Sequence, residues 1–223
     1  MSDFSVGTRF VKLAAVVAIM LTSFAPEWAR AALPDKQADI TAATTGSSQT
    51  AVFAGGCFWG VDAVFKHVKG VIEVESGYAG GDASTANYAQ VSGGASGHAE
   101  SVRIRFNPAQ VSYQQLLQVF FKVAHDPTQL NRQGPDVGSQ YRSAIFYTSA
   151  EQQRLALTQV QQITKARTFA NPVVTQIVPL QQFHRAEQYH QNYLALHPNQ
   201  PYIVFNDMPK LEHLRQEFPL LYK

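Results

Sequence analysis

The sequence predicts an α+β fold, a two-layer sandwich in which helices pack on a mostly antiparallel sheet. The first observation is that apolar and polar residues alternate over 71–76 and 98–106, which is typical of half-buried strands. The second is that apolar residues recur at helical spacing after Cys57 and again after Ser112. The third is the order of the segments, strand, helix, strand, strand, helix, strand, helix, strand, which favours helices on one antiparallel sheet over alternating parallel units.

Each predicted element is bounded by residues that commonly begin or end structure. Two glycines follow the first strand, Gly70 is placed as a helix C-cap, and Ser112 is placed as an N-cap. The sequence His125-Asp126-Pro127 ends the second helix. The further expected strands are 51–54, 143–147 and 173–178, and the further expected helices are 151–167, 186–196 ended by Pro198, and a weak one at 211–218.

Two long polar segments lie between these elements. The first, 77–97, is rich in glycine and other small residues, and the second runs from Asp126 to Arg142. Ordered loops of this length are uncommon in compact domains and are often functional. The first segment, 77–97, is therefore a candidate functional loop.

The N-terminal residues have the three-part pattern of a secretory signal peptide. Arg9 and Lys12 precede an apolar run from Leu13 to about Ala25, and 29–31 offers small residues for cleavage. The run is too short to span a bilayer comfortably, which takes about 20 residues. An uncleaved anchor and an amphipathic helix of the mature protein remain alternatives. We expect a signal peptide at 1–31, only transient membrane contact through it, and export, with a periplasm-like destination.

The remainder of the chain is expected to form one domain. Residues 32–50 are rich in Ala, Thr, Ser and Gln and predict a flexible mature N-terminus. Residues 51–223 are long enough to bury a sizeable core as a single catalytic domain. We expect this domain to act as a monomer.

Composition excludes several classes of function. The formal net charge is only +2, without a dense Lys/Arg run, so no nucleic-acid partner is expected. Cys57 is the only cysteine, which excludes an intramolecular disulfide and a thiolate-rich zinc site. A single cysteine is often only a small buried apolar residue, so its neighbours must decide its role.

The neighbours of Cys57 indicate a nucleophile. Gly55 and Gly56 let the chain turn sharply after a strand, and Cys57 then falls at the first turn of a helix. The unpaired N–H groups and the dipole at that point favour a thiolate, which is the reactive form. Phe58 and Trp59 are large for a turn and could form a pocket for a methyl group.

The Gly-Cys-Phe-Trp-Gly segment at 56–60 resembles the active-site signature of the A-type peptide methionine sulfoxide reductases. Further blocks resemble that family in the family's order, and the resemblance extends from about Val52 to at least Leu194. The blocks are Ser-Gly-Tyr-Ala-Gly-Gly at 76–81, Gly-His-Ala-Glu at 97–100, His-Asp-Pro at 125–127 and Gln-Tyr-Arg-Ser-Ala at 140–144. The resemblance implies a ferredoxin-like α+β sandwich.

The resemblance also implies the catalytic residues. Cys57 would attack the sulfoxide sulfur, and Glu100 would protonate the oxygen, for which burial must keep its carboxyl protonated at neutral pH. Tyr88 and Tyr141 match tyrosines whose hydroxyls bind the sulfoxide oxygen. Considered alone, Glu100 could be a solvated strand residue and the tyrosines could be packing residues.

Substrate binding is implied in the same way. Phe58 and Trp59 would hold the S-methyl group, and an asymmetric pocket would select the S epimer at sulfur. Asp136 matches an aspartate that helps hold water or the tyrosines, although it could be a plain loop residue. His184, Glu187 and His190 lack familiar metal-ligand spacing, so no metal site is expected.

Recycling of the cysteine is where the sequence departs from many family members. Attack on the sulfoxide would leave Cys57 as a sulfenic acid, and the tail 211–223 contains no second cysteine to resolve it. An external thiol such as a thioredoxin-like protein is therefore expected, with no bound cofactor.

Two other functions remain open from the sequence. One is a thiol hydrolase, with His98 or His190 as the base for Cys57. The other is a non-catalytic binder of oxidised methionine. Turnover with an added dithiol separates both from a reductase.

Overall fold

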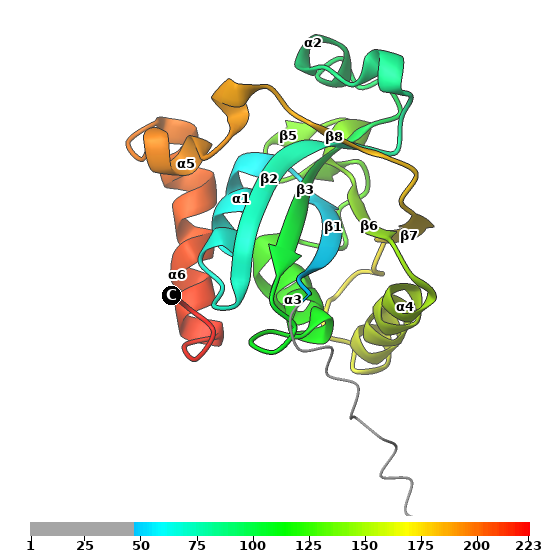
Figure 1. The fold of residues 1–223 in the computed structure, drawn as a ribbon, viewed down its shortest axis with the longest axis vertical. Coiled ribbons are helices and arrows are strands. Elements are labelled where there is room, and N and C mark those ends of the chain that lie inside the picture. Colours follow the sequence, from blue (N-terminus) through cyan, green and yellow to red (C-terminus); the bar gives the residue numbers. More distant parts are fainter. Residues whose placement is uncertain (1–46) are drawn as a thin grey trace, which may run out of the picture. The chain divides into compact units, whose positions relative to one another are not determined.

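A computed structural model describes residues 47–223, and these form one body (Figure 1). The predicted signal peptide at 1–31 and most of the predicted flexible segment at 32–50 lie outside the described residues. Within 47–223, none of the helices is both long enough and apolar enough to cross a membrane.

The centre of the fold is a mixed, mostly antiparallel sheet. Its strands lie in the order β7-β6-β1-β3-β2-β8, and only the β6–β7 pair is parallel. The strands β1, β2, β3 and β6, with the helices between them, have the connectivity of a ferredoxin-like sandwich, which confirms the predicted fold class. The strand bounds are β1 Gln49–Gly55, β2 Val71–Ala79, β3 Ala99–Phe106, β6 Ser143–Tyr147, β7 Gln176–Pro179 and β8 Phe183–Arg185.

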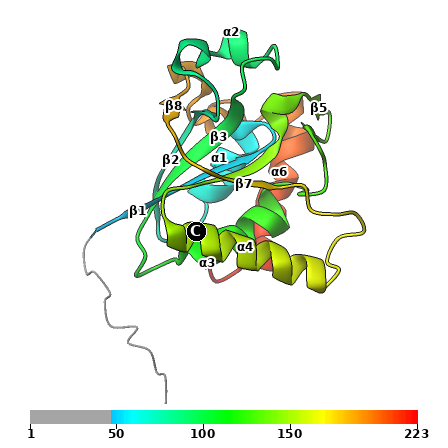
Figure 2. The ribbon, with the colours of Figure 1, turned by 90° about the vertical axis from the view of Figure 1, so that its right-hand side faces the viewer.

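Helices cover one face of this sheet, as Figures 1 and 2 show from two sides. Helix α1 packs on β2, β3 and β1, helix α3 packs on α4, and helix α6 packs on α1. The longer helices are α1 Phe58–Lys66, α3 Tyr113–Val119 with a π-helical continuation Phe120–Ala124, α4 Ala150–Lys165 and α6 Met208–Glu217.

Shorter elements lie mainly in the two long polar segments and in the C-terminal part. They are the helical turns η2 Ala83–Thr85, α2 Tyr88–Val91, η4 Ser139–Tyr141, η5 Gln188–His190, α5 Tyr193–Leu196 and η6 Ile203–Asp207, and the strands β4 Arg132–Gln133 and β5 Asp136–Val137.

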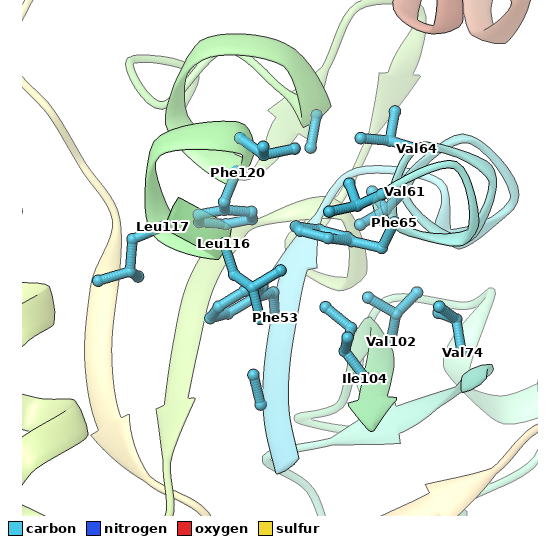
Figure 3. Packing of buried hydrophobic residues seen from close by; sticks show 14 of the residues in the cluster. Phe53, Val61, Val64, Phe65, Val74, Val102, Ile104, Leu116, Leu117 and Phe120 are labelled. Atoms are coloured by element: carbon cyan, nitrogen blue, oxygen red, sulfur yellow. The ribbon is translucent and has the colours of Figure 1, made fainter. Parts of the chain in front are cut away.

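The main core lies between the sheet and the helices. Phe53 of β1 stacks on Phe120 with ring centroids 4.8 Å apart, and Val61 and Phe65 of α1 close the core from the other side (Figure 3). The opposite face of the sheet has its own small apolar cluster, covered by residues 178–183, which run from β7 to β8. That cluster consists of Val52, Ala54, Ala79, Ala99, Ala144 and Phe146 with Val178, Leu180 and Phe183.

Several predicted boundaries agree with the structure. Ser112 caps α3 in a capping box with Gln115, and β6 occupies 143–147 as expected. The first strand begins at Gln49 rather than Ala51, because Gln49 and Thr50 pair with the end of β3.

The helix predicted at 186–196 is wrong. Its first residues instead follow β8, whose residues Phe183–Arg185 pair with Gly77–Ala79 of β2. The Gln191 side chain then bonds the backbone N–H and carbonyl of Ser76, and Asn192 has a left-handed φ of 56°. Pairing with the sheet edge therefore replaces helical hydrogen bonds, and only short turns remain. The strand predicted at 173–178 is also shifted, because pairing with β6 begins at Gln176.

Candidate active site

Cys57 occupies the turn between the central strand β1 and helix α1. Gly56 has a φ of +91°, which favours glycine, and a Cβ there would lie 2.5 Å from the Gln133 side chain. Cys57 is the N-cap residue of α1 and is only 8% exposed. The two glycines thus bring the cysteine to the end of the strand, beneath the loop that contains Gln133.

The electrostatic surroundings of Cys57 do not favour the thiolate that the sequence predicted at the helix N-terminus. Burial raises the pKa of the thiol well above its ordinary value, and the carboxyl groups of Glu100 and Asp207 raise it further. The backbone N–H of Trp59 and the ammonium group of Lys210 lower the pKa but do not offset burial. The helix N-terminus alone therefore does not produce a thiolate, and the resting group is a thiol.

Glu100 lies on β3 and is joined to the turn that holds Cys57. Its Oε2 accepts a hydrogen bond of 3.1 Å from the backbone N–H of Phe58. The side chain is 2% exposed, and burial raises the pKa of its carboxyl to about 8, with a smaller contribution from Asp136. Glu100 therefore holds a proton at neutral pH beside the cysteine.

Tyr88 and Tyr141 come from the two long polar segments, 77–97 and 126–142. Tyr88 begins α2, and Tyr141 ends the turn η4. Both rings pack against the buried cluster that contains Cys57 and Phe58. Burial raises the pKa of both phenols, so each remains a neutral hydrogen-bond donor.

The two aromatic residues after Cys57 have different surroundings. Phe58 is 1% exposed, and its ring lies 4.9 Å from that of His190. Trp59 is partly exposed and stacks on Tyr193, with centroids 3.7 Å apart and planes 6° apart. Tyr202 meets the indole edge-on at 6.0 Å. Together these rings form an apolar wall beside the cysteine.

Asp136 is bound to a tyrosine other than the two predicted. Its Oδ2 accepts a hydrogen bond from the hydroxyl of Tyr202, which lies in the C-terminal part of the chain. Tyr202 had no sequence signal of its own, because it follows a predicted helix end and lies far along the chain from the other site residues.

The Glu187 carboxylate accepts hydrogen bonds from two tyrosines, a role that the sequence did not predict. One oxygen accepts the Tyr78 hydroxyl at 2.8 Å, and the other accepts the backbone N–H of Tyr88 at 2.9 Å. Glu187 thus fixes the start of α2, and with it the position of the Tyr88 side chain, against β2.

An ion pair with a buried carboxylate, from the C-terminal part, packs on α1, and it had no signal in the sequence. Lys210 Nζ lies 3.1 Å from Asp207 Oδ1, and Asp207 is 1% exposed. A Cβ on Gly60 would lie 2.1 Å from that oxygen, so only glycine permits this approach. Both charged groups influence the Cys57 thiol.

His98 and His190, the candidate bases of a thiol hydrolase, form hydrogen bonds with groups other than Cys57. His98 Nδ1 accepts the Gly81 N–H, and its Nε2 donates to the Asp82 carbonyl. His190 Nδ1 accepts the Trp59 indole N–H at 3.2 Å. Neither arrangement provides the Cys–His hydrogen bond of a thiol hydrolase.

Within residues 47–223, no three His, Cys, Asp or Glu side chains lie close enough together to hold a metal ion. His125, from one of the sequence blocks, has a structural role. It bonds the Phe120 carbonyl and the Ser143 hydroxyl, and burial lowers its pKa to about 4.

A buried thiol at a helix N-terminus, a protonated carboxyl group and an aromatic wall define a thiol-dependent enzyme on a ferredoxin-like sandwich. The family profile described as Peptide methionine sulfoxide reductase matches residues 49–220. The chain belongs to the peptide methionine sulfoxide reductase family, and its curated relatives identify it as an A-type member.

Two relatives and two solved structures show the extent of the similarity. The chain is 54% identical to "Peptide methionine sulfoxide reductase MsrA 2" of Mesorhizobium japonicum, over 78% of this chain and 90% of the relative. It is 48% identical to a protein of the same name from Synechocystis, over 83% and 88%.

Among solved structures, reduced Mxr1 of Saccharomyces cerevisiae matches with a TM-score of 0.63 and 33% identity, over 69% of this chain and 87% of that one. The methionine sulfoxide reductase A of Corynebacterium diphtheriae matches with a TM-score of 0.60 and 31% identity, over 68% and 76%. The protein is therefore an oxidoreductase that reduces methionine sulfoxide.

Proposed function

We propose that the protein reduces the S epimer of methionine sulfoxide, in proteins and as the free amino acid, with Cys57 as the nucleophile. The observation that carries the proposal is the hydrogen bond from the Phe58 N–H to Glu100, which holds a protonated acid beside the cysteine. A sulfoxide oxygen is a poor leaving group unless it is protonated, so a carboxyl group with a raised pKa suits this reaction.

The reaction begins as the Cys57 sulfur attacks the sulfoxide sulfur. Glu100 gives its proton to the oxygen as the S–O bond polarises, and the Tyr88 and Tyr141 hydroxyls donate to the same oxygen. The oxygen is transferred to the cysteine, so that methionine leaves and Cys57 becomes a sulfenic acid. The thiol proton restores Glu100, and the atoms balance without a bound cofactor.

The aromatic wall accounts for selectivity. Phe58 and Trp59 contact the methyl group on sulfur, while the oxygen faces Glu100 and the tyrosines. With the methyl group and the oxygen assigned to different walls, only one epimer presents its sulfur to Cys57. The remainder of the substrate extends toward solvent, which accommodates both a peptide and the free amino acid.

Regeneration requires a thiol from outside, because Cys57 is the only cysteine in the chain. Two external thiols reduce the sulfenic acid to the thiol, release water and become a disulfide. A thioredoxin-like protein has the required pair of thiols, so we propose it as the partner. The signal-peptide pattern at 1–31 supports export to a periplasm-like compartment, where oxidised exported proteins would be the substrates of a monomeric enzyme.

The test is turnover of each epimer of a methionine sulfoxide peptide with and without dithiothreitol. We expect many turnovers with the S epimer and dithiol, little product from the R epimer, and none from Cys57→Ser. Equal rates with both epimers would contradict the proposed pocket. Binding without product under any condition would favour a non-catalytic binder. Replacing dithiothreitol by a thioredoxin and its reductase tests the partner separately.

A further inference from the structure

The indole of Trp59 is held from one side by a short C-terminal segment. Its Nε1–H donates to His190 Nδ1 at 3.2 Å, and its face stacks on Tyr193 at 3.7 Å. His190 and Tyr193 belong to the adjacent turns η5 and α5. The hydrogen bond limits rotation of the indole within its plane, and the stack limits its tilt.

The direction of this hydrogen bond fixes the state of His190. An indole nitrogen is only a donor, so His190 Nδ1 must be the acceptor and the ring proton must lie on Nε2. His190 is 2% exposed, and burial lowers its pKa, so the ring stays neutral. Nε2 is buried without a hydrogen-bond partner among residues 47–223. Leaving a buried donor unpaired in this way costs free energy.

The other contacts of the His190 ring lie around the proposed substrate pocket. The His190 ring lies 4.5 Å from the Tyr88 ring and 4.9 Å from the Phe58 ring, besides its bond to Trp59. A single imidazole therefore touches three of the residues assigned to the sulfoxide, and it reaches one of them through a directional hydrogen bond.

The segment that contains His190 is itself fixed to the sheet. The His190 N–H donates to the Glu187 carbonyl, and the Glu187 carboxylate accepts from Tyr78 of β2. The next residue, Gln191, bonds both the N–H and the carbonyl of Ser76. His190 thus has a defined position relative to β2, and it transmits that position to Trp59.

We propose that His190 is a positioning residue that sets the orientation of the Trp59 indole and thereby the fit of the substrate methyl group. This inference rests on the proposed role of Trp59 as a wall of the methyl pocket. His190 acts through the indole and does not touch the reacting sulfur or oxygen.

The matched substitutions are His190→Leu and His190→Asn, because leucine and asparagine have nearly the same shape. The asparagine carbonyl lies near the position of Nδ1 and can accept the indole N–H, whereas leucine cannot. We expect His190→Leu to raise KM for the S-epimer peptide about tenfold, with kcat within about threefold of the parent, because loss of one oriented hydrogen bond loosens the pocket. His190→Asn should recover most of the lost affinity.

A spectroscopic measurement follows the indole itself. Trp59 becomes the only tryptophan in a Trp28→Phe background, and its ¹⁵N-labelled indole N–H can be observed by NMR. We expect faster solvent exchange of this proton in His190→Leu and near-parent exchange in His190→Asn. An unchanged KM and unchanged exchange in folded His190→Leu would overturn the inference.

Trp59→Phe tests whether His190 acts through the indole N–H, since this substitution keeps an aromatic ring but removes the donor. If His190 acts through the indole N–H, His190→Leu should have little further effect on KM in the Trp59→Phe background. A full additional loss there would overturn the inference even if His190→Leu alone is poorly folded. If Trp59→Ala leaves KM unchanged, the proposed pocket fails instead.

Discussion

Oε2 of Glu100 lies 3.1 Å from the backbone nitrogen of Phe58, the residue directly after Cys57. This bond joins β3 to the first turn of α1 and so fixes the distance between the acid and the nucleophile by main-chain geometry. The N–H lowers the carboxyl pKa, but burial raises it more, and the outcome is a pKa of about 8. The contact therefore positions the acid without causing it to lose its proton.

Substitution Glu100→Gln should remove the acid and keep the fold, because the amide oxygen can still accept the Phe58 N–H. We expect kcat for methionine formation to fall roughly 10²–10³-fold, as is typical for loss of a general acid. The control is Glu151→Gln on the exposed start of α4, which should retain parent activity. Comparable activity in Glu100→Gln would exclude Glu100 as the proton donor.

The pH dependence of activity should show a break near pH 8, because the Glu100 carboxyl then loses its proton. The Cys57 thiolate, the reactive form, still increases above this pH because the pKa of the thiol is raised, so the rate should rise below pH 8 and level off above it. The rate of methionine formation in a single turnover, measured from pH 6 to 10, reports this break without interference from the reductant. The residual rate of Glu100→Gln should rise without the break. A rate that rises continuously to pH 10 in the parent would show that cysteine ionisation alone controls the step.

The stability of the fold should depend on pH through the same group. The folded-state pKa of about 8 exceeds the ordinary 4.5, so between these values the folded state binds more protons than the unfolded state. Stability from Glu100 is therefore complete below about pH 4.5 and is lost as pH rises toward 8. Urea unfolding at pH 5 and pH 8 should show a larger loss for the parent than for Glu100→Gln. An equal loss in both would contradict the raised pKa.

The two charged groups of the Asp207–Lys210 ion pair should shift the pKa of the Cys57 thiol in opposite directions. Lys210 lowers the Cys57 pKa and Asp207 raises it. We expect Lys210→Met to slow alkylation of Cys57 by iodoacetamide at pH 8 and Asp207→Asn to accelerate it, because only the thiolate reacts. Lys122→Met, which removes an exposed cation, serves as the control. Changes of the same sign in both variants would indicate altered access rather than charge.

Gly60→Ala should disturb the packing of the C-terminal part on α1. The new Cβ would lie 2.1 Å from Asp207 Oδ1, so the Asp207–Lys210 pair must move. We expect a loss of about 1–3 kcal/mol in the free energy of unfolding, as for overpacked cores. Gly93→Ala is the control, because its Cβ would meet only one atom, at 3.4 Å. Equal stability of the two variants would contradict the close packing.

Much of the fold was predictable from local patterns. The alternation of Val102, Ile104 and Phe106 fixes which face of β3 meets the helices, and by the same parity it places Glu100 on that face. Ala99 has the opposite parity and lies on the other face, in the second apolar cluster. The sharp turn at Gly56 and the helix N-cap at Ser112 could also be predicted, because both depend only on residues close by in the sequence.

The remainder of the site depends on contacts between distant parts of the chain. Tyr202 reaches Asp136, and Asp207 reaches Gly60, across separations that no local pattern records. The segment around His190 has helical spacing, but it takes its shape from the open edge of β2. The raised thiol pKa was missed for the same reason, since burial and neighbouring carboxyl groups outweigh the helix terminus that the sequence made visible.

The most direct test of the account is a single turnover without reductant, followed by trapping of the protein with dimedone and peptide mass spectrometry. The central claim is that the sulfoxide oxygen passes to Cys57. We predict about one methionine formed per protein molecule and a dimedone adduct on the peptide that contains Cys57. The adduct should be absent when the sulfoxide is omitted and from Cys57→Ser. Methionine formed without modification of Cys57, or formed by Cys57→Ser, would contradict the account.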